Sequence, residues 1–336
     1  MAVPRIVIEK ERKSMNIGII GAGNIASKMA VTVNGLEDIT LYAIASRSEE
    51  KAKTFAEKFG AKKYYGSYED MLKDDNVELV YIATPHSEHY DNAMLCISYK
   101  KPVLCEKAFT ANAFQAKKVF DYAHKERVFI TEAIWTRYMP MVGLIKDVIE
   151  KGMIGEPKML SANLSYPIED KRRNFDPALA GGCLLDLGVY PINFAFIFFG
   201  DDVKTVTSDC VISETGVDSQ ETVTIHYNDG RMACLNASQQ CLGDRKGMIH
   251  GTKGYIVIEN INNYESFKVY DNNYNIIMHE KAPAQITGYE YEVLACKRAI
   301  SEGKYECDEM PHTESIKMME FMDALRKEWG IKFPFE

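Results

Sequence analysis

A glycine-rich turn between a short apolar segment and a helical segment constrains this chain more than any other feature. Residues 15–20 have the pattern of a buried strand, and Gly21-Ala22-Gly23-Asn24-Ile25-Ala26 follows directly and opens a helical pattern. Gly21 allows a tight turn, and Gly23 lets the backbone approach a pyrophosphate at the helix N-terminus. We therefore expect Gly21, Gly23, Asn24 and Ile25 to hold a dinucleotide, with a glycine turn that binds no ligand as the alternative.

Strands and helices alternate along the first part of the chain. Further short strands are expected at 41–45, 63–65, 77–83, 101–105 and 128–131, and helices at 48–59 and 111–126. This alternation predicts an α/β fold with a parallel, doubly wound sheet of the Rossmann type. We expect this dinucleotide-binding domain to span residues 15–137, after an N-terminal extension of residues 1–14.

The pattern changes character after a helix at 141–151, which Gly152 closes. Longer strands joined by tight turns now dominate, and Asn228-Asp229-Gly230 is a typical hairpin signal. The expected strands are 158–166, 203–212, 222–227, 231–237, 247–251, 255–259 and 267–270, and the expected final helices are 288–301 and 313–328. Residues 138–336 should thus form an α+β domain with a large, mostly antiparallel, open-faced sheet.

Composition and charge narrow the classes of partner. Among 336 residues, 40 Lys+Arg stand against 48 Asp+Glu, so the net charge of −8 has the wrong sign for binding nucleic acid. The apolar run 189–199 is too short for a membrane span, and we expect a buried helix and no membrane. Residues 1–14 lack the apolar core of a secretory signal, which predicts a cytoplasmic protein. The eight cysteines stand singly, as buried free thiols in a reducing compartment would.

The end of the second expected strand bears on the choice of cofactor. It reads Ala45-Ser46-Arg47, with no carboxylate before Glu49. A carboxylate at this point would pair with the ribose 2′-hydroxyl of NAD, whereas Ser46 and Arg47 suit the 2′-phosphate of NADP. We expect NADP(H) to be preferred and NAD(H) to be possible. In the alternative, Arg47 is a solvated surface charge or stacks on the adenine.

Polar residues follow the fourth and fifth strands, at the edge where doubly wound sheets bind ligands. Thr84-Pro85-His86-Ser87-Glu88-His89 follows the fourth strand, and Glu106-Lys107-Ala108 follows the fifth. The residues expected to face the cofactor are Thr84, Pro85, His86, His89, Glu106 and Lys107. No set of carboxylates and cysteines accompanies the two histidines, so no metal site is predicted.

Two later segments, 132–137 and 181–191, complete a recognisable pattern. The first reads Glu-Ala-Ile-Trp-Thr-Arg, and the second reads Gly-Gly-Cys-Leu-Leu-Asp-Leu-Gly-Val-Tyr-Pro. With the Thr-Pro-His and Glu-Lys strand ends, they make the chain from Met15 onward resemble the Gfo/Idh/MocA oxidoreductases. Within that family, the Trp-Thr-Arg and Asp-Leu-Gly-x-Tyr segments are most similar to the branch of dimeric dihydrodiol dehydrogenase and glucose-fructose oxidoreductase.

The resemblance implies which residues carry the chemistry. Lys107 stands where the family has the lysine of its Glu-Lys-Pro motif, although Ala108 replaces the proline. Many relatives have a histidine four residues after the aspartate, and this chain has Tyr190 at that distance from Asp186. Tyr190 is therefore the implied acid/base residue.

The neighbours of Tyr190 receive supporting roles in this interpretation. The ammonium of Lys107 is expected to lower the pKa of Tyr190 and to donate to the substrate oxygen. Asp186 would orient Lys107 or a substrate hydroxyl, with a helix N-cap as the alternative. Trp135 and Arg137 would line the cleft between the domains and contact the substrate.

Together these features predict an NAD(P)-dependent oxidoreductase that transfers a hydride between nicotinamide and a hydroxyl or carbonyl group. The resemblance implies a sugar, polyol or trans-dihydrodiol substrate and a homodimer, or a dimer of dimers, formed through the C-terminal sheet. Two alternatives stay open. One is a glycosidase that uses tightly bound NAD for transient oxidation, and the other is a dinucleotide-binding regulator without catalysis.

Overall fold

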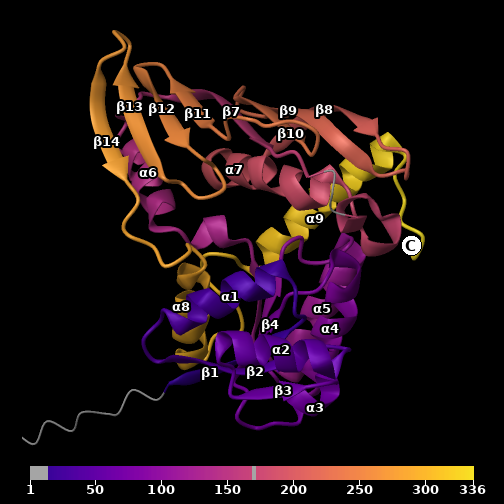
Figure 1. Ribbon diagram of the computed structural model, residues 1–336. Helices are drawn as coiled ribbons and strands as arrows, with labels where there is room; N and C mark the ends of the chain where they lie inside the picture. Colours follow the sequence, from indigo (N-terminus) through magenta and orange to yellow (C-terminus); the bar gives the residue numbers. More distant parts are fainter. Residues whose placement is uncertain (1–13, 169–171) are drawn as a thin grey trace, which may run out of the picture.

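The computed structural model describes residues 14–168 and 172–336, and Figure 1 shows two sheets with helices around and between them. Most of the expected extension, residues 1–13, lies outside the described residues. The first sheet has six parallel strands in the order β3-β2-β1-β4-β5-β6. Its strands are β1 (Met15–Ile20), β2 (Ile39–Ala45), β3 (Lys63–Tyr65), β4 (Leu79–Ile82), β5 (Val103–Glu106) and β6 (Ile130–Ala133). The predicted parallel, doubly wound sheet is confirmed.

Helices connect these strands, and local signals set their ends. They are α1 (Asn24–Asn34), α2 (Glu49–Phe59), α3 (Tyr68–Leu72), α4 (His86–Ser98) and α5 (Ala113–Glu126). In α2, the Ser48 side chain accepts a hydrogen bond from the Lys51 N–H at the start, and Gly60 ends the helix with a left-handed φ of 75°. The sequence pattern had not predicted α4, which begins directly after the end of β4.

The second sheet has eight strands in the order β14-β13-β12-β11-β7-β10-β9-β8. Its strands are β7 (Pro157–Ser165), β8 (Val203–Ile212), β9 (Asp218–Tyr227), β10 (Met232–Ser238), β11 (Gly247–Gly251), β12 (Gly254–Glu259), β13 (Ser266–Asp271) and β14 (Ile276–Lys281). Only β10 and β7 pair in parallel, so the sheet is mostly antiparallel as predicted. The hairpin at 228–230 is confirmed between β9 and β10, whereas β14 was not predicted.

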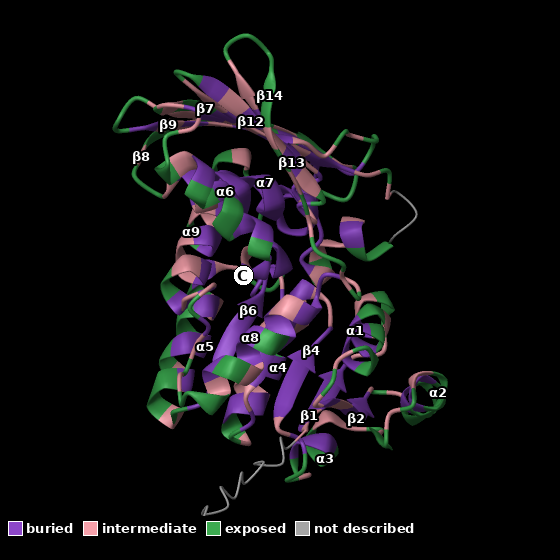
Figure 2. Cartoon of the chain, turned by 90° about the vertical axis from the view of Figure 1, so that its left-hand side faces the viewer, coloured by how far each residue is buried: buried purple, intermediate pink, exposed green. Residues whose placement is uncertain are grey.

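The eight-stranded sheet and the helices beneath it form the second layer of the protein, and their hydrophobic core lies between them. Helices α6 (Pro140–Glu150) and α7 (Val189–Phe199) pack on its inner side, and Figure 2 shows the interior between the sheets as mostly buried. By length and composition alone, the helical segment 177–199 could cross a membrane, but 89% of an apolar 18-residue stretch within it is buried inside the protein. The prediction of a buried core helix at 189–199 is therefore confirmed.

The last helices return to the first sheet. Helix α8 (Glu290–Ser301) lies beside α1, and α9 (His312–Trp329) packs against α5. On the way between them, the chain contacts β6: the Ile130 N–H donates to the Tyr305 carbonyl at 3.0 Å, and the Thr131 hydroxyl donates to the Met310 carbonyl at 3.3 Å. The C-terminal helices thus hold the two layers together.

Candidate active site

A cavity of about 370 Å³ lies between the two layers, at the carboxyl ends of the parallel strands. Its walls come from the glycine turn, from the ends of β4 and β5, from the start of α7 and from the start of α8. The lining residues are Gly23, Asn24, Ile25, Lys28, Ala83, Thr84, Pro85, Glu106, Lys107, Arg173, Tyr190 and Tyr289. The structure therefore brings most of the expected cofactor residues together with Lys107 and Tyr190.

The glycine turn has the form that dinucleotide binding requires. Gly21 has φ of 97°, and a Cβ added to it would lie 2.8 Å from the Ala83 carbonyl oxygen. Helix α1 begins at Asn24 without a side-chain cap, and a Cβ on Gly23 would project into open space. The first N–H groups of α1 are thus left to a phosphate. These residues fit a dinucleotide.

Ser46 and Arg47, which were predicted to determine the preference for NADP(H) over NAD(H), lie outside the cavity, at the end of β2. Arg47 is exposed and lies near Tyr68, whose pKa its charge lowers against the larger effect of burial. The Ser46 hydroxyl accepts a hydrogen bond from the Ser48 N–H at 3.3 Å. Both residues follow β2, the strand that pairs with β1 next to the glycine turn.

Lys107 and Asp186 form an ion pair across the boundary between the two layers. The Lys107 Nζ donates to the Asp186 carbonyl oxygen at 2.6 Å and to its Oδ1 at 3.2 Å. Arg173 also donates to Oδ1 at 3.2 Å, and Asn174 donates to Oδ2 at 2.9 Å. Burial raises the pKa of Asp186, but the charges of Lys107 and Arg173 outweigh it and hold the pKa well below its usual value. Asp186 is therefore ionised.

Tyr190 lies beside this pair, but its pKa shifts in the direction opposite to our expectation. Burial raises the pKa of Tyr190 well above its usual value, and Tyr289 and the carboxylate of Glu106 raise it further. The Lys107 Nζ lies over the ring face, 5.0 Å from its centroid, and its hydrogen bonds go to Asp186. The effect of burial on the pKa of Tyr190 is the largest one. The expected lowering of the Tyr190 pKa is wrong for this state.

Asp186 is not a helix N-cap. The helix that carries it already begins at Cys183, and Leu184–Gly188 form a π-turn in which the Val189 N–H bonds back to the Leu184 carbonyl. Such turns often occur at functional sites because they interrupt the regular backbone ladder. Here the turn presents both the carbonyl and the carboxylate of Asp186 to Lys107.

Trp135 and Arg137 do not line the cavity, in contrast to the prediction. Trp135 stacks behind Tyr289 with ring centroids 4.3 Å apart. The Arg137 side chain is 8% exposed, and it donates to Asn193 at 2.6 Å and to Glu314 at 3.0 Å. Both belong to the short 3₁₀ helix that follows β6 and points them into the protein. They support the walls of the site from behind.

The two histidines also lie behind the cavity wall. His86 Nδ1 donates to the Ala180 carbonyl at 3.0 Å, and His89 lies between the carbonyl oxygens of Ala108 and Thr84, at 2.9 and 2.8 Å. Burial lowers the pKa of His86 to about 3 and that of His89 to about 4. They fix backbone segments next to the cavity rather than face the cofactor as predicted.

Glu106 is buried at the cavity and held by β4 and by its own strand end. The Tyr81 hydroxyl makes a short hydrogen bond to Glu106 Oε1, and the Lys107 N–H donates to Oε2 at 3.2 Å. Burial raises the pKa of Glu106. The Lys107–Ala108 peptide bond that follows is cis.

Comparison with known proteins accounts for both layers. Residues 15–133 match the model of the Gfo/Idh/MocA oxidoreductase family with an NAD-binding Rossmann fold, and residues 142–257 match the C-terminal domain of the same family. The chain belongs to the Gfo/Idh/MocA oxidoreductase family. The trans-1,2-dihydrobenzene-1,2-diol dehydrogenases of Xenopus tropicalis and Mus musculus are each 31% identical to it over 332 residues, which cover 94% of this chain and 98% and 97% of theirs.

Solved structures of other proteins have the same fold. A 3-ketoreductase from Actinomadura kijaniata, in complex with NADP and TDP-benzene, has a TM-score of 0.85 at 23% identity, covering 94% of this chain and 98% of its own. Levoglucosan dehydrogenase, in complex with NADH and levoglucosan, has a TM-score of 0.83 at 19% identity, covering 94% and 97%. At these identities the likeness concerns the fold.

Four cavity residues of this Gfo/Idh/MocA oxidoreductase were not predicted from the sequence, and one of them, Ala83, directly precedes the predicted Thr84. Lys28 lies one helical turn after Asn24, so its place could have been read from the glycine motif. Arg173 belongs to the short 3₁₀ helix Arg172–Phe175, and Tyr289 follows Gly288, which has φ of 95° and at which an added Cβ would contact Trp135. Neither of these two has a local signal that connects it with the cavity.

Proposed function

We propose that this oxidoreductase transfers a hydride between NADP(H) and the carbon of a secondary hydroxyl or carbonyl group in a sugar, polyol or trans-dihydrodiol. One observation supports this proposal above all: Lys107 and Tyr190 both line the cavity that the glycine turn also lines. Asp186 accepts hydrogen bonds from Lys107 beside them. The relatives support these substrate classes, since their names include a dihydrodiol dehydrogenase, a 3-ketoreductase and a levoglucosan dehydrogenase.

Side chains of this protein transfer the proton that accompanies the hydride. A bound nicotinamide gives the hydride in reduction and takes it in oxidation. In the reducing direction, Tyr190 donates its phenolic proton to the carbonyl oxygen while the carbon receives the hydride. The ammonium of Lys107, over the ring of Tyr190, then stabilises the phenolate that remains. In the oxidising direction, the same phenolate accepts the proton of the alcohol.

Burial, together with the charges around the site, keeps Tyr190 in its protonated form in the resting enzyme. Its raised pKa keeps the hydroxyl protonated, while Asp186 keeps Lys107 in place by two hydrogen bonds. A neutral phenol and a fixed ammonium are the states that carbonyl reduction needs at its start. Tyr190 therefore requires no prior loss of a proton in that direction.

NADP(H) is the proposed cofactor, with NAD(H) as the weaker ligand. Arg47 is exposed and Ser46 half-buried at the end of β2, and no carboxylate stands between them and the start of α2. A guanidinium can bind a 2′-phosphate with two parallel hydrogen bonds. The N-terminus of α2 follows at once, but Glu49 and Glu50 in its first turn offset the favourable end of the helix dipole, so the 2′-phosphate contact depends on Arg47 and Ser46.

A substrate screen with both cofactors tests the proposal. Wild-type enzyme and Tyr190→Phe are compared on a panel of sugars, polyols and trans-diols by nicotinamide absorbance, with cofactor consumption measured against product. Stoichiometric consumption that depends on Tyr190 supports the proposal. Hydrolysis of a glycoside with no net consumption would favour the glycosidase, and binding of NADPH with no turnover on any substrate would favour the regulator.

We also propose that two chains pair through the open face of the eight-stranded sheet. Met232, Met159, His250, Tyr255 and Tyr270 lie side by side across neighbouring strands and face away from α7. An apolar row of this kind is rarely left in water, and twofold pairing is the commonest way to cover it. Sedimentation should give twice the mass of one chain, and Met159→Lys should shift the mass toward one chain. A single-chain mass for the unmodified protein at micromolar concentration would contradict the pairing.

A further inference from the structure

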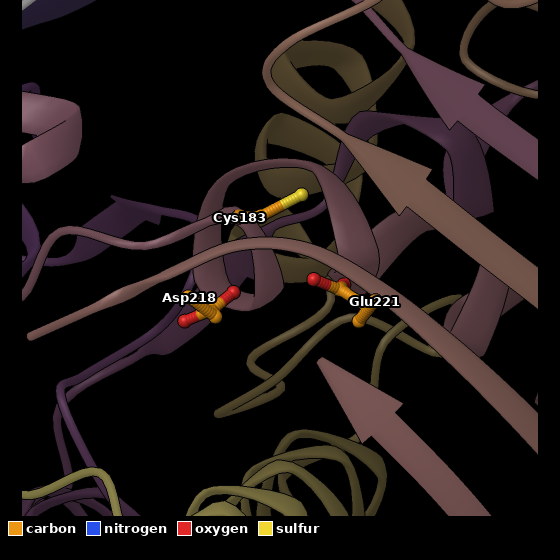
Figure 3. A group of neighbouring side chains, drawn as sticks. All are labelled: Cys183, Asp218 and Glu221. Atoms are coloured by element: carbon orange, nitrogen blue, oxygen red, sulfur yellow. The ribbon is translucent and has the colours of Figure 1, made fainter. Parts of the chain in front are cut away.

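A buried acidic group lies directly beneath the π-turn that carries Asp186. Cys183, Asp218 and Glu221 are all buried, and their Sγ and carboxylate oxygens lie within 4.8 Å of one another. Figure 3 shows the three side chains gathered where the start of this helix crosses β9. The catalytic proposal above does not use this group.

Asp218 binds the beginning of the helix. One of its oxygens accepts a hydrogen bond from the Leu184 N–H at 2.5 Å, and a Cβ on Gly182 would lie 2.4 Å from the other. Burial raises the pKa of Asp218, while the N–H groups of Leu184 and Cys183 lower it. Asp218 thus acts as a cap supplied by the second sheet, at the helix end that favours a negative charge.

Glu221 bears on the middle of the π-turn. A Cβ on Gly188 would lie 1.8 Å from Glu221 Oε1, so only glycine leaves room for this carboxyl group. Among the described residues, neither Glu221 oxygen has a hydrogen-bond partner. Burial raises the pKa of Glu221 well above its usual value, and the charge of Asp218 raises it further. The neutral acid is therefore favoured more strongly at Glu221 than at Asp218, which accepts a hydrogen bond from the Leu184 N–H.

We propose that Asp218 and Glu221 are positioning residues, which together fix the helical turn that presents Asp186 and Tyr190 to Lys107. Asp218 accepts a hydrogen bond at the start of the turn, and the Glu221 carboxyl group packs closely against Gly188, which lies midway between Asp186 and Tyr190 in the sequence. The inference rests on the proposed function, since Asp186 and Tyr190 matter only if they serve the reaction. The inference gives strand β9, which carries Asp218 and Glu221, a role in the reaction.

A metal ion is the main competing explanation for the same cluster. Two features favour a bound proton over a metal ion between the two carboxyl groups. N–H groups at the start of the helix already donate to Asp218. Burial raises the pKa of the Cys183 thiol well above its usual value, which disfavours the thiolate that a metal would bind. The groups that act on Glu221 are Asp218, through its charge, and the neighbouring thiol of Cys183, and neither is a cation.

Variants at Glu221 and Gly188 test the positioning role. Glu221→Ala should lower kcat at least tenfold, with NADPH affinity within twofold of wild type, because the glycine turn does not touch β9. Glu221→Gln, which keeps the shape of the side chain and is uncharged, should restore kcat to within threefold of wild type. Gly188→Ala should lower kcat as Glu221→Ala does, and adding Glu221→Ala to it should recover part of the loss. Unchanged kcat in Glu221→Ala, or equal losses in kcat and NADPH affinity, would overturn the proposal.

A readout without catalysis separates this inference from the proposed function. In a Trp329→Phe background, the remaining tryptophan is Trp135, which lies next to Tyr190. Its emission should shift in Glu221→Ala and return in Glu221→Gln. If the Trp135 emission shifts in Glu221→Ala and returns in Glu221→Gln while Tyr190→Phe keeps full turnover, the proposed function fails and the positioning role of Glu221 stands. If Tyr190 proves essential while Glu221→Ala changes neither emission nor kcat, the positioning fails alone. One metal ion per wild-type chain that Glu221→Gln lacks would also overturn it.

Discussion

Replacing Lys107 with methionine should separate the structural and the chemical contributions of its pair with Asp186. The two side chains are 11% and 12% exposed. Methionine keeps the apolar stem and removes the charge, so Asp186 stays buried with fewer donors. Loss of one partner from a buried pair costs roughly 3–5 kcal/mol. Because Arg173 and Asn174 still donate to Asp186, we expect the lower end, about 3 kcal/mol, and a loss of turnover of at least a hundredfold.

The double variant makes this test decisive. Adding Asp186→Asn removes the unpaired charge, so it should recover about 2 kcal/mol of the unfolding free energy, while turnover stays as low as in Lys107→Met. Lys73→Met is the matched control, since Lys73 pairs with Asp70 at 2.9 Å but both side chains are exposed. Its effect should stay within about 0.5 kcal/mol. Stability is followed by urea unfolding. A double variant no more stable than Lys107→Met, or a stable Lys107→Met, would refute the reasoning.

Three further results are expected. Tyr190→Phe should lower turnover by roughly two to four orders of magnitude at unchanged NADPH affinity, and near-normal turnover would return Tyr190 to a packing role. Arg47→Ala should weaken NADPH binding by roughly tenfold and leave NADH binding unchanged in fluorescence titrations, and equal losses would contradict the 2′-phosphate contact. The pKa of Asp186 is lowered by folding, so its pairing stabilises the protein above the unfolded pKa of about 3.9 and is lost as the pH falls through the folded value. Asp186→Asn should therefore flatten the acid side of the stability profile, and an unchanged profile would contradict that account.

The parts of the fold that were predictable are those with a local cause. The first strand, the turn at Gly21 and helix α1 follow from an apolar run and from backbone that only glycine adopts without strain. Strand β14 was missed because it is a largely exposed edge strand, and so lacks the apolar alternation of a buried one. Helix α4 was missed because its first residues, from His86, had been assigned only to the end of β4. The return of α8 and α9 to the first sheet depends on contacts between distant residues, for which no local signal exists.

The candidate site was predictable in its residue types more than in its geometry. Lys107 and the glycine turn were expected at strand ends, and the structure places them at the cavity. Trp135 and Arg137 were assigned to the same cleft, but a 3₁₀ turn directs them inward. The pKa of Tyr190 was predicted in the wrong direction because burial and the binding of Lys107 to Asp186 are tertiary effects. A motif can name the charged groups, but it does not show which of them are already paired.

The two halves of the site belong to different layers, and whole elements bring them together. Lys107 follows β5 of the first sheet, whereas Asp186 and Tyr190 belong to the helix that packs under the second sheet. Arg137, just after β6, bonds to Asn193 of α7 and to Glu314 of α9, and so ties these layers at a second point. The 3.2 Å contact between Lys107 and Asp186 is thus set by the packing of both layers, over a separation of 79 residues along the chain. No local segment of the sequence could have specified that contact, although each partner was recognisable on its own.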